Sequence, residues 1–201
     1  MLQAWDAVRS DDASTYSKGQ NYMKNWMLLL VLFFSVSALE QQSGTQKSPA
    51  DLRKFLLTQL QETHNQKNWF VSEKEAVAGL TPEQAAWSDG KNHSVGQLLQ
   101  HLNFWNSTNL AGFKGQHPPG PEGNDNSNTF KFEPKQWDAA LKQFDSVMNE
   151  WEQTVEKADD ATLARLAPLV ARIAEHNAYH IGEMIAVRKG HGMWNPDLGV
   201  K

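Results

Sequence analysis

The 201-residue sequence contains no cysteine. This absence excludes disulfide bonds, zinc sites with thiolate ligands and attachment through a lipidated cysteine. It leaves histidine, aspartate and glutamate as the strong metal ligands. Clusters of lysine or arginine are also missing, and the formal net charge is -4. Because nucleic-acid-binding proteins present a basic surface, we expect no nucleic-acid partner.

Strand patterns are also missing, since no stretch alternates apolar and polar residues for long enough to predict a strand. A polar segment rich in Gly, Pro and Asn, residues 116–133, separates the second and third of four helical patterns. These patterns predict an all-α protein, a four-helix bundle with a long crossover loop between helices two and three. The four segments are 49–76, either continuous or broken near 64–67, then 94–112, 134–157, and 162–189 or 168–189.

An apolar segment near the N-terminus has the layout of a secretory signal peptide. Lys24 precedes an apolar run that starts at Trp26 and extends at most to Leu39, about 14 residues, whereas a bilayer-spanning helix needs about 20. Val36 and Ala38 are small residues at the positions expected before a cleavage site after Ala38. The segment therefore predicts export rather than a transmembrane span.

This interpretation defines the domain organisation. It predicts an exported protein, periplasmic or secreted, that meets the membrane only through its signal segment. An uncleaved N-terminal anchor is the alternative. The outer helical faces show no decisive apolar patch, so a monomer and a homodimer both stay open. The predicted parts are residues 1–38 as an N-terminal extension plus signal peptide with the start at Met23, 39–48 as a linker, 49–195 as the bundle, and 196–201 as a tail.

Two histidines of the fourth segment, His176 and His180, are four residues apart within AEHNAYHIGEMIAVRKGHG. On a helix they point the same way, about 6 Å apart along the axis, a spacing at which two imidazoles can hold one ion. His101 lies in the apolar stripe of the second segment, and helix bundles build metal sites from facing helices. The pattern favours a divalent-metal site at these three histidines. Core packing and a pH switch are the alternatives.

Two further side chains of the fourth segment are candidates for chemistry. Glu183 lies three residues after His180 and suits a fourth ligand, an acceptor for an imidazole N–H, a catalytic base or an ion-pair partner. Arg188, two turns beyond His180, suits either an anion-binding role or a contact at the helix end. The remaining histidines fall in breaks, loops or the tail, where we expect solvated side chains: His64, His93, His117 and His191.

The segments HSVGQLLQHLNFWN and EHNAYHIGEMIAVRKGHGMW together resemble the DinB-like superfamily (DinB/YfiT-like). The family pattern has one histidine in the second helix and H-x-x-x-H in the fourth, followed by a small residue, Gln or Glu, and a late Arg. The stretch GLTPEQAAW also looks like the family's lead-in to the second helix. The resemblance covers about residues 50–195 and implies a crossover four-helix bundle that binds one divalent ion through three histidines. The matching positions are His101, His176, His180, Gly182, Glu183 and Arg188.

The resemblance also implies an activity. Family members include metal-dependent thiol-S-transferases that use bacillithiol, mycothiol or a similar low-molecular-weight thiol. We therefore expect a hydrolase or thiol transferase for a small-molecule substrate, with Glu183 as a catalytic residue and Arg188 as a substrate-binding residue. Imidazole ligands do not choose among late first-row ions, so we expect Zn²⁺ or Ni²⁺, with Mn²⁺ or Fe²⁺ as alternatives. A metal- or ligand-binding bundle without turnover is the alternative function.

Overall fold

The computed structural model describes residues 48–199. The chain divides into two units, Met1–Gln46 and Lys47–Lys201, and all described residues belong to the second. The predicted N-terminal extension, signal peptide and residues 39–47 of the linker lie outside the described residues. Within residues 48–199, no helix combines the length and apolar character that crossing a membrane requires.

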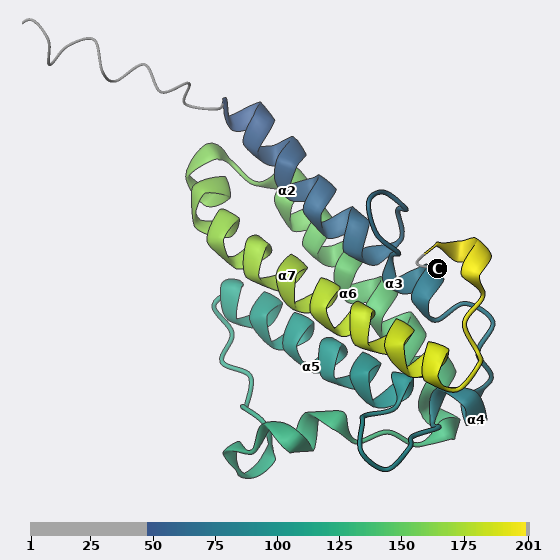
Figure 1. Cartoon of the computed structure of the whole chain (residues 1–201). Helices are drawn as coiled ribbons and strands as arrows, with labels where there is room; N and C mark the ends of the chain where they lie inside the picture. Colours follow the sequence, from purple (N-terminus) through teal and green to yellow (C-terminus); the bar gives the residue numbers. More distant parts are fainter. Residues whose placement is uncertain (1–47, 200–201) are drawn as a thin grey trace, which may run out of the picture. The chain divides into compact units, whose positions relative to one another are not determined.

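The regular structure of the described residues is helical throughout, so the all-α prediction is confirmed. Figure 1 shows α7 lying between α2 and α5, and α6 completes a ring by packing on α2 and α5. The α-helices are α2 (Pro49–His64), α3 (Glu73–Ala76), α4 (Pro82–Ala85), α5 (Val95–Phe113), α6 (Trp137–Lys157) and α7 (Asp160–Gly190). The 3₁₀ turns are η1 (Glu122–Asn124), η2 (Asn126–Phe130), η3 (Pro134–Gln136) and η4 (Pro196–Leu198).

Side-chain caps set where the helices begin. Ser94 starts α5 with a capping box, in which its Oγ accepts the Gln97 N–H at 3.2 Å and the Gln97 Oε1 accepts the Ser94 N–H at 2.8 Å. Asp159 caps α7 by accepting the Thr162 N–H at 2.7 Å. Because of this cap, α7 begins before both start points that the sequence suggested, and it continues through Pro168.

The helices α5 and α6 run parallel to each other. Asn103, in the middle of α5, donates a hydrogen bond to the Ala140 carbonyl near the start of α6 at 2.9 Å. Phe113, at the end of α5, meets Trp151 further along α6, with ring centroids 6.4 Å apart. Parallel neighbours need a connection that returns along the bundle, and residues 114–136 make it.

This returning segment packs closely on the first turn of α5. A Cβ built on Gly96 would lie 2.2 Å from Cε1 of Phe132 in the returning segment. Only a glycine at this position therefore lets the Phe132 ring rest on the helix. The contact places the preceding turn, η2, against α5, next to the region that carries His101.

The core lies between the four long helices, and its side chains come from the apolar stripes that the sequence shows. Each fully buried leucine or phenylalanine of such a stripe contributes roughly 1.5–3 kcal/mol. The largest fully buried side chains are Trp151, Phe144, Leu56, Leu60, Leu98, Leu99, Leu102, Met148, Leu163, Leu166, Ile181 and Met184.

The first predicted helix is interrupted, and its end corrects one sequence prediction. We expected a solvated His64, but the structure buries it at 2% exposure at the end of α2. Its Nδ1 lies 2.8 Å from Oε1 of Glu152, and its Nε2 lies 3.0 Å from Oδ1 of Asp145. Both carboxylates come from α6, so the ring ties two helices that are distant in sequence.

The described part of the predicted tail packs against the domain. The Lys67 ammonium donates to the Leu198 carbonyl at 3.1 Å, and the Trp194 indole N–H donates to the Gly199 carbonyl at 3.1 Å. Residues 196–199 therefore rest on the loop that follows α2.

We expect the His64→Ala substitution to lower the free energy of unfolding by about 3 kcal/mol, because it leaves a cavity and removes the partner of two carboxylates. Chemical denaturation followed by circular dichroism measures this loss. The matched control is Asp145→Asn, which keeps an acceptor at a side chain that is 67% exposed. The control should cost about 1 kcal/mol or less. Equal losses for the two substitutions would contradict the structural role of His64.

Candidate metal centre

The three histidines that the sequence singles out come together between α5 and α7. His101 is 3% exposed and His180 is 7% exposed. The Asn106 Nδ2, about one turn beyond His101 on α5, donates to the Oδ1 of Asn177, which directly follows His176 on α7, at 2.9 Å, and both amides are buried. This bond holds the register that puts His101 opposite the two histidines of α7.

Three imidazole nitrogens converge at this place. The Nε2 of His176 lies 3.1 Å from the Nε2 of His101 and 3.1 Å from the Nε2 of His180. The three ligand atoms all lie within 4.8 Å of one another. Two nitrogens that each bind one ion at about 2.1 Å with a tetrahedral angle are about 3.4 Å apart. The spacing therefore fits three ligands of one ion.

The hydrogen bond of His101 determines which of its nitrogens faces the site. Its Nδ1 lies 2.6 Å from the hydroxyl oxygen of Thr129, in η2. That hydroxyl donates its only hydrogen to the Asn126 carbonyl at 2.7 Å, so it accepts a hydrogen bond from the His101 Nδ1–H. The neutral ring then carries no hydrogen on Nε2, and the lone pair of Nε2 points at the other histidines.

Glu183 does the same for His180. Its Oε2 lies 2.6 Å from the Nδ1 of His180, and a carboxylate accepts the Nδ1–H. The Nε2 of His180 is therefore also a bare lone pair in the neutral ring. Among the roles that the sequence suggested for Glu183, this contact matches that of an acceptor that orients a candidate metal-binding imidazole.

These two anchored rings test whether the residues fit a cation. The Nε2 of His176 meets two lone pairs at 3.1 Å but carries at most one hydrogen in its neutral form. It can therefore donate a hydrogen bond to only one of the two neighbouring Nε2 lone pairs. A single cation satisfies all three lone pairs at once, so the donor set fits a divalent ion.

The site also holds the rings in the neutral form that metal ligation needs. Burial, followed by the neighbouring rings, lowers the pKa of His101 to about 3. Burial and then His180 lower the pKa of His176 to about 4. The pKa of His180 is also lowered by burial, against the opposing effect of Glu183.

Aromatic rings close one side of the site. The Phe130 ring stacks on His101 with centroids 4.0 Å apart and on His93 with centroids 3.9 Å apart. His93, which we expected only as a solvated loop residue, thus belongs to the surroundings of the site. Thr129 and Phe130 escaped sequence reasoning because they lie in the polar crossover segment, which carries no periodic pattern.

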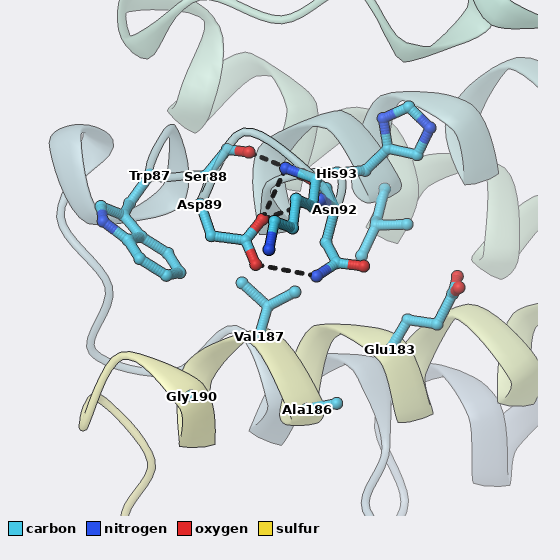
Figure 2. Close-up of a pocket in the computed structure, with 11 residues that line it drawn as sticks. Trp87, Ser88, Asp89, Asn92, His93, Glu183, Ala186, Val187 and Gly190 are labelled. Atoms are coloured by element: carbon cyan, nitrogen blue, oxygen red, sulfur yellow. Dashed lines mark hydrogen bonds between the residues drawn. The ribbon is translucent and has the colours of Figure 1, made fainter.

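A cavity of about 530 Å³ adjoins the site on the Glu183 side. Figure 2 shows Glu183 on α7 facing the loop that carries His93. The loop is folded on itself by Asp89, whose Oδ1 accepts the backbone N–H groups of Lys91 and Asn92 at 2.8 Å each. The volume lies within the range of about 300–1,000 Å³ that small-molecule sites occupy.

Arg188, which we expected to bind substrate, instead forms hydrogen bonds with backbone carbonyl oxygens of the protein itself. Its guanidinium donates to the carbonyl oxygens of Ala76 at 2.6 Å, Ala78 at 3.0 Å and Met193 at 2.9 Å. The side chain is 4% exposed, and burial lowers its pKa below the ordinary value. The residue holds α3 and the C-terminal segment on α7, and these contacts do not support a role in binding substrate.

The fold and the site define an all-helical protein with a candidate metal centre of three histidines between two neighbouring helices. The chain matches the sequence profile of the DinB superfamily over residues 74–186, more than half of its length. It belongs to the DinB superfamily, which is metal-binding. The matched range contains all three histidines and Glu183. Comparison with curated proteins and with solved structures found no match.

The lowered pKa values predict a pH-dependent stability for the metal-free chain. Unfolded histidine takes up a proton near pH 6.5, whereas folded His101 and His176 do so only near pH 3 and 4. The unfolded chain therefore binds more protons in this window, and stability falls as the pH falls from about 6.5 toward 4. Denaturation with a chelator present, at several pH values, measures the fall.

The matched comparison is His176→Gln, whose side chain does not titrate, with His117→Gln in an exposed loop as the control. The loss of stability on lowering the pH should be smaller in His176→Gln than in the wild type, and the same as in the wild type in His117→Gln. Burial, and then Asp145, raises the pKa of Glu73 to about 8, which acts in the opposite direction. That effect is common to all the chains and cancels in the comparison. The same fall in both variants would contradict the prediction.

Proposed function

We propose that this chain is a metal-dependent enzyme, a hydrolase or a transferase, that acts on a small molecule at one divalent ion held by His101, His176 and His180. The observation that carries the proposal is the convergence of the three Nε2 atoms, two of them with their outer nitrogens anchored. Sites with three protein ligands keep a position for water or substrate, whereas structural sites use four. The adjoining cavity supports a substrate rather than a closed site.

The histidines suit Zn²⁺ or Ni²⁺, with Mn²⁺ and Fe²⁺ as alternatives, because neutral imidazole binds all of these ions. When bound, such an ion polarises a substrate group and lowers the pKa of a water or thiol. The chain contributes the positions of the ligands. Thr129 and Glu183 orient His101 and His180, and the Phe130 ring covers the face of His101.

Glu183 is the chain's best candidate for moving a proton in this reaction. Its carboxylate accepts the His180 Nδ1–H, while the side chain is 41% exposed and lines the adjoining cavity. It therefore lies between the metal ligands and the space where a small molecule would bind. A carboxylate in this position can hold a proton taken from a nucleophile and pass it to a leaving group.

We assign the protein to the outside of the cytoplasm, periplasmic or secreted, on the sequence of its N-terminal segment. Lys24 and the apolar run after it support this assignment, and so does the absence of cysteine, which removes the hazard of unwanted oxidation. An uncleaved anchor remains the alternative location.

The chain, purified without a histidine tag, should bind about one divalent ion, measured by inductively coupled plasma mass spectrometry after exposure to Zn²⁺, Ni²⁺ or Mn²⁺. His101→Ala, His176→Ala and His180→Ala should each weaken binding more than roughly 100-fold, because each removes a ligand. Helical circular dichroism checks that the variants fold. His117→Ala, in an exposed loop, is the matched control and should bind normally.

Absence of metal after supplementation would refute the proposed function and leave the histidines as packing or switching residues. If all three variants still bind about one ion per chain, the ion binds at another place in the protein. A chain that binds metal but turns over none of a panel of esters, amides and thiol-acceptor electrophiles would favour the alternative of a non-catalytic metal-binding bundle.

Glu183→Gln should weaken metal affinity about 10-fold, because a neutral amide orients the His180 ring less firmly than a carboxylate. Competition with a chromophoric chelator measures the affinity. Glu175→Gln, on the exposed side of the same helix, is the matched control. Equal affinities of the Glu183→Gln and Glu175→Gln chains would remove Glu183 from the site.

A further inference from the structure

A second hollow lies beside the histidines, toward the start of α7, whereas the cavity with Glu183 lies toward its end. Its volume is about 240 Å³. His176 lines it, so this hollow meets one of the three candidate ligands directly. Its walls come from α5 and α7, chiefly Trp105, Asn109, Leu169, Arg172 and His176.

The charge of this hollow has one sign. Within residues 48–199, Arg172 is the one permanently charged side chain that lines the hollow, and no aspartate or glutamate lines it. The cavity on the other side differs, because Asp89, Lys91 and Glu183 line it together. A hollow with one cation and no acid favours an anion.

Arg172 is available for a ligand. Its side chain is exposed, and within residues 48–199 it takes part in none of the ion pairs or side-chain hydrogen bonds. Arg188, on the same helix, is buried with its donors bonded to carbonyl oxygens. Of these two arginines of α7, only Arg172 keeps its guanidinium free to bind a carboxylate or phosphate through two parallel hydrogen bonds.

The geometry relates Arg172 to the candidate metal centre. It precedes His176 by four residues, so the two side chains leave the same face of α7, about 6 Å apart along the axis. The wall opposite, on α5, presents the Trp105 ring beside Asn109, and the ring is held in place because the Trp105 indole N–H donates to the Oδ1 of Asn126 at 3.1 Å. A molecule lying in the hollow would have its anionic end at Arg172 and its other end at His176.

We propose that this hollow binds the anionic end of the substrate, and that the substrate class is a small molecule with one carboxylate or phosphate on a compact apolar body. Arg172 pairs with the anionic group, and Trp105 and Leu169 contact the body. The inference rests on the proposed function, because the metal centre determines which end of the molecule reacts.

The test titrates the full chain, with and without added Zn²⁺, with benzoate and with phenyl phosphate by calorimetry. Benzamide serves as the neutral analogue. Arg172→Gln should weaken binding of the anions roughly 10-fold or more, because a charge-assisted pair is lost, and should leave benzamide unaffected. Arg172→Lys should restore part of the affinity. The anion that binds with the higher affinity, benzoate or phenyl phosphate, shows whether the substrate carries a carboxylate or a phosphate.

The matched control is Arg165→Gln. Arg165 lies on the same helix, over the Phe113 ring at 5.5 Å, and does not line the hollow. This substitution should change no affinity. If wild type and Arg172→Gln bind phenyl phosphate and benzoate equally, or if neither anion binds, the proposed subsite is overturned.

Metal content measured on the same samples separates the two proposals. A chain that holds one ion but shows no Arg172-dependent binding refutes the subsite and leaves the proposed function standing. A chain that holds no ion refutes the proposed function. In that chain, Arg172-dependent binding of the anions still supports the subsite, and its absence overturns it.

Discussion

The register between α5 and α7 is the constraint on which the candidate site depends. His101 belongs to one helix and His176 and His180 to the other, so the 3.1 Å separation between the Nε2 atoms of His101 and His176 exists only in one register. The buried bond between Asn106 and Asn177 specifies that register, because shifting it would leave the buried Asn177 Oδ1 without its donor at a cost of about 1–3 kcal/mol. Apolar packing makes the bundle stable, and this polar contact positions the histidines.

The parallel arrangement of α5 and α6 has a chemical consequence. It requires a connection that returns along the bundle, and that connection brings Thr129 and Phe130 onto His101. The Thr129 hydroxyl then determines which nitrogen of His101 carries the hydrogen. Gly96 makes the return possible at close range, because any side chain there would collide with Phe132. A requirement of topology thus supplies one of the two groups that orient the candidate metal ligands.

The charged side chains of α7 show that burial gives residues of the same type different roles. Arg188 is surrounded by carbonyl oxygens and serves the fold, whereas Arg172 faces a hollow and is free for a ligand. Glu183 combines the two situations, because it accepts a hydrogen bond from His180 and also lines a cavity that a ligand can reach. The candidate site therefore has two neighbouring pockets of different charge. The cavity beside Glu183 carries both signs, whereas the hollow beside Arg172 is basic.

The sequence alone determined the features that depend on local geometry. The start of α5 follows from the capping residue Ser94, and the shared direction of His176 and His180 follows from 3.6 residues per turn. The tertiary structure decided the features that depend on residues far apart in the chain. The burial of His64 between two carboxylates of α6, the ring stack of His93 and Phe130 beside His101, and the availability of Arg172 rather than Arg188 are of this kind. Periodicity says which face of a helix is buried, but only the packing of the helices says which partner each buried polar group meets.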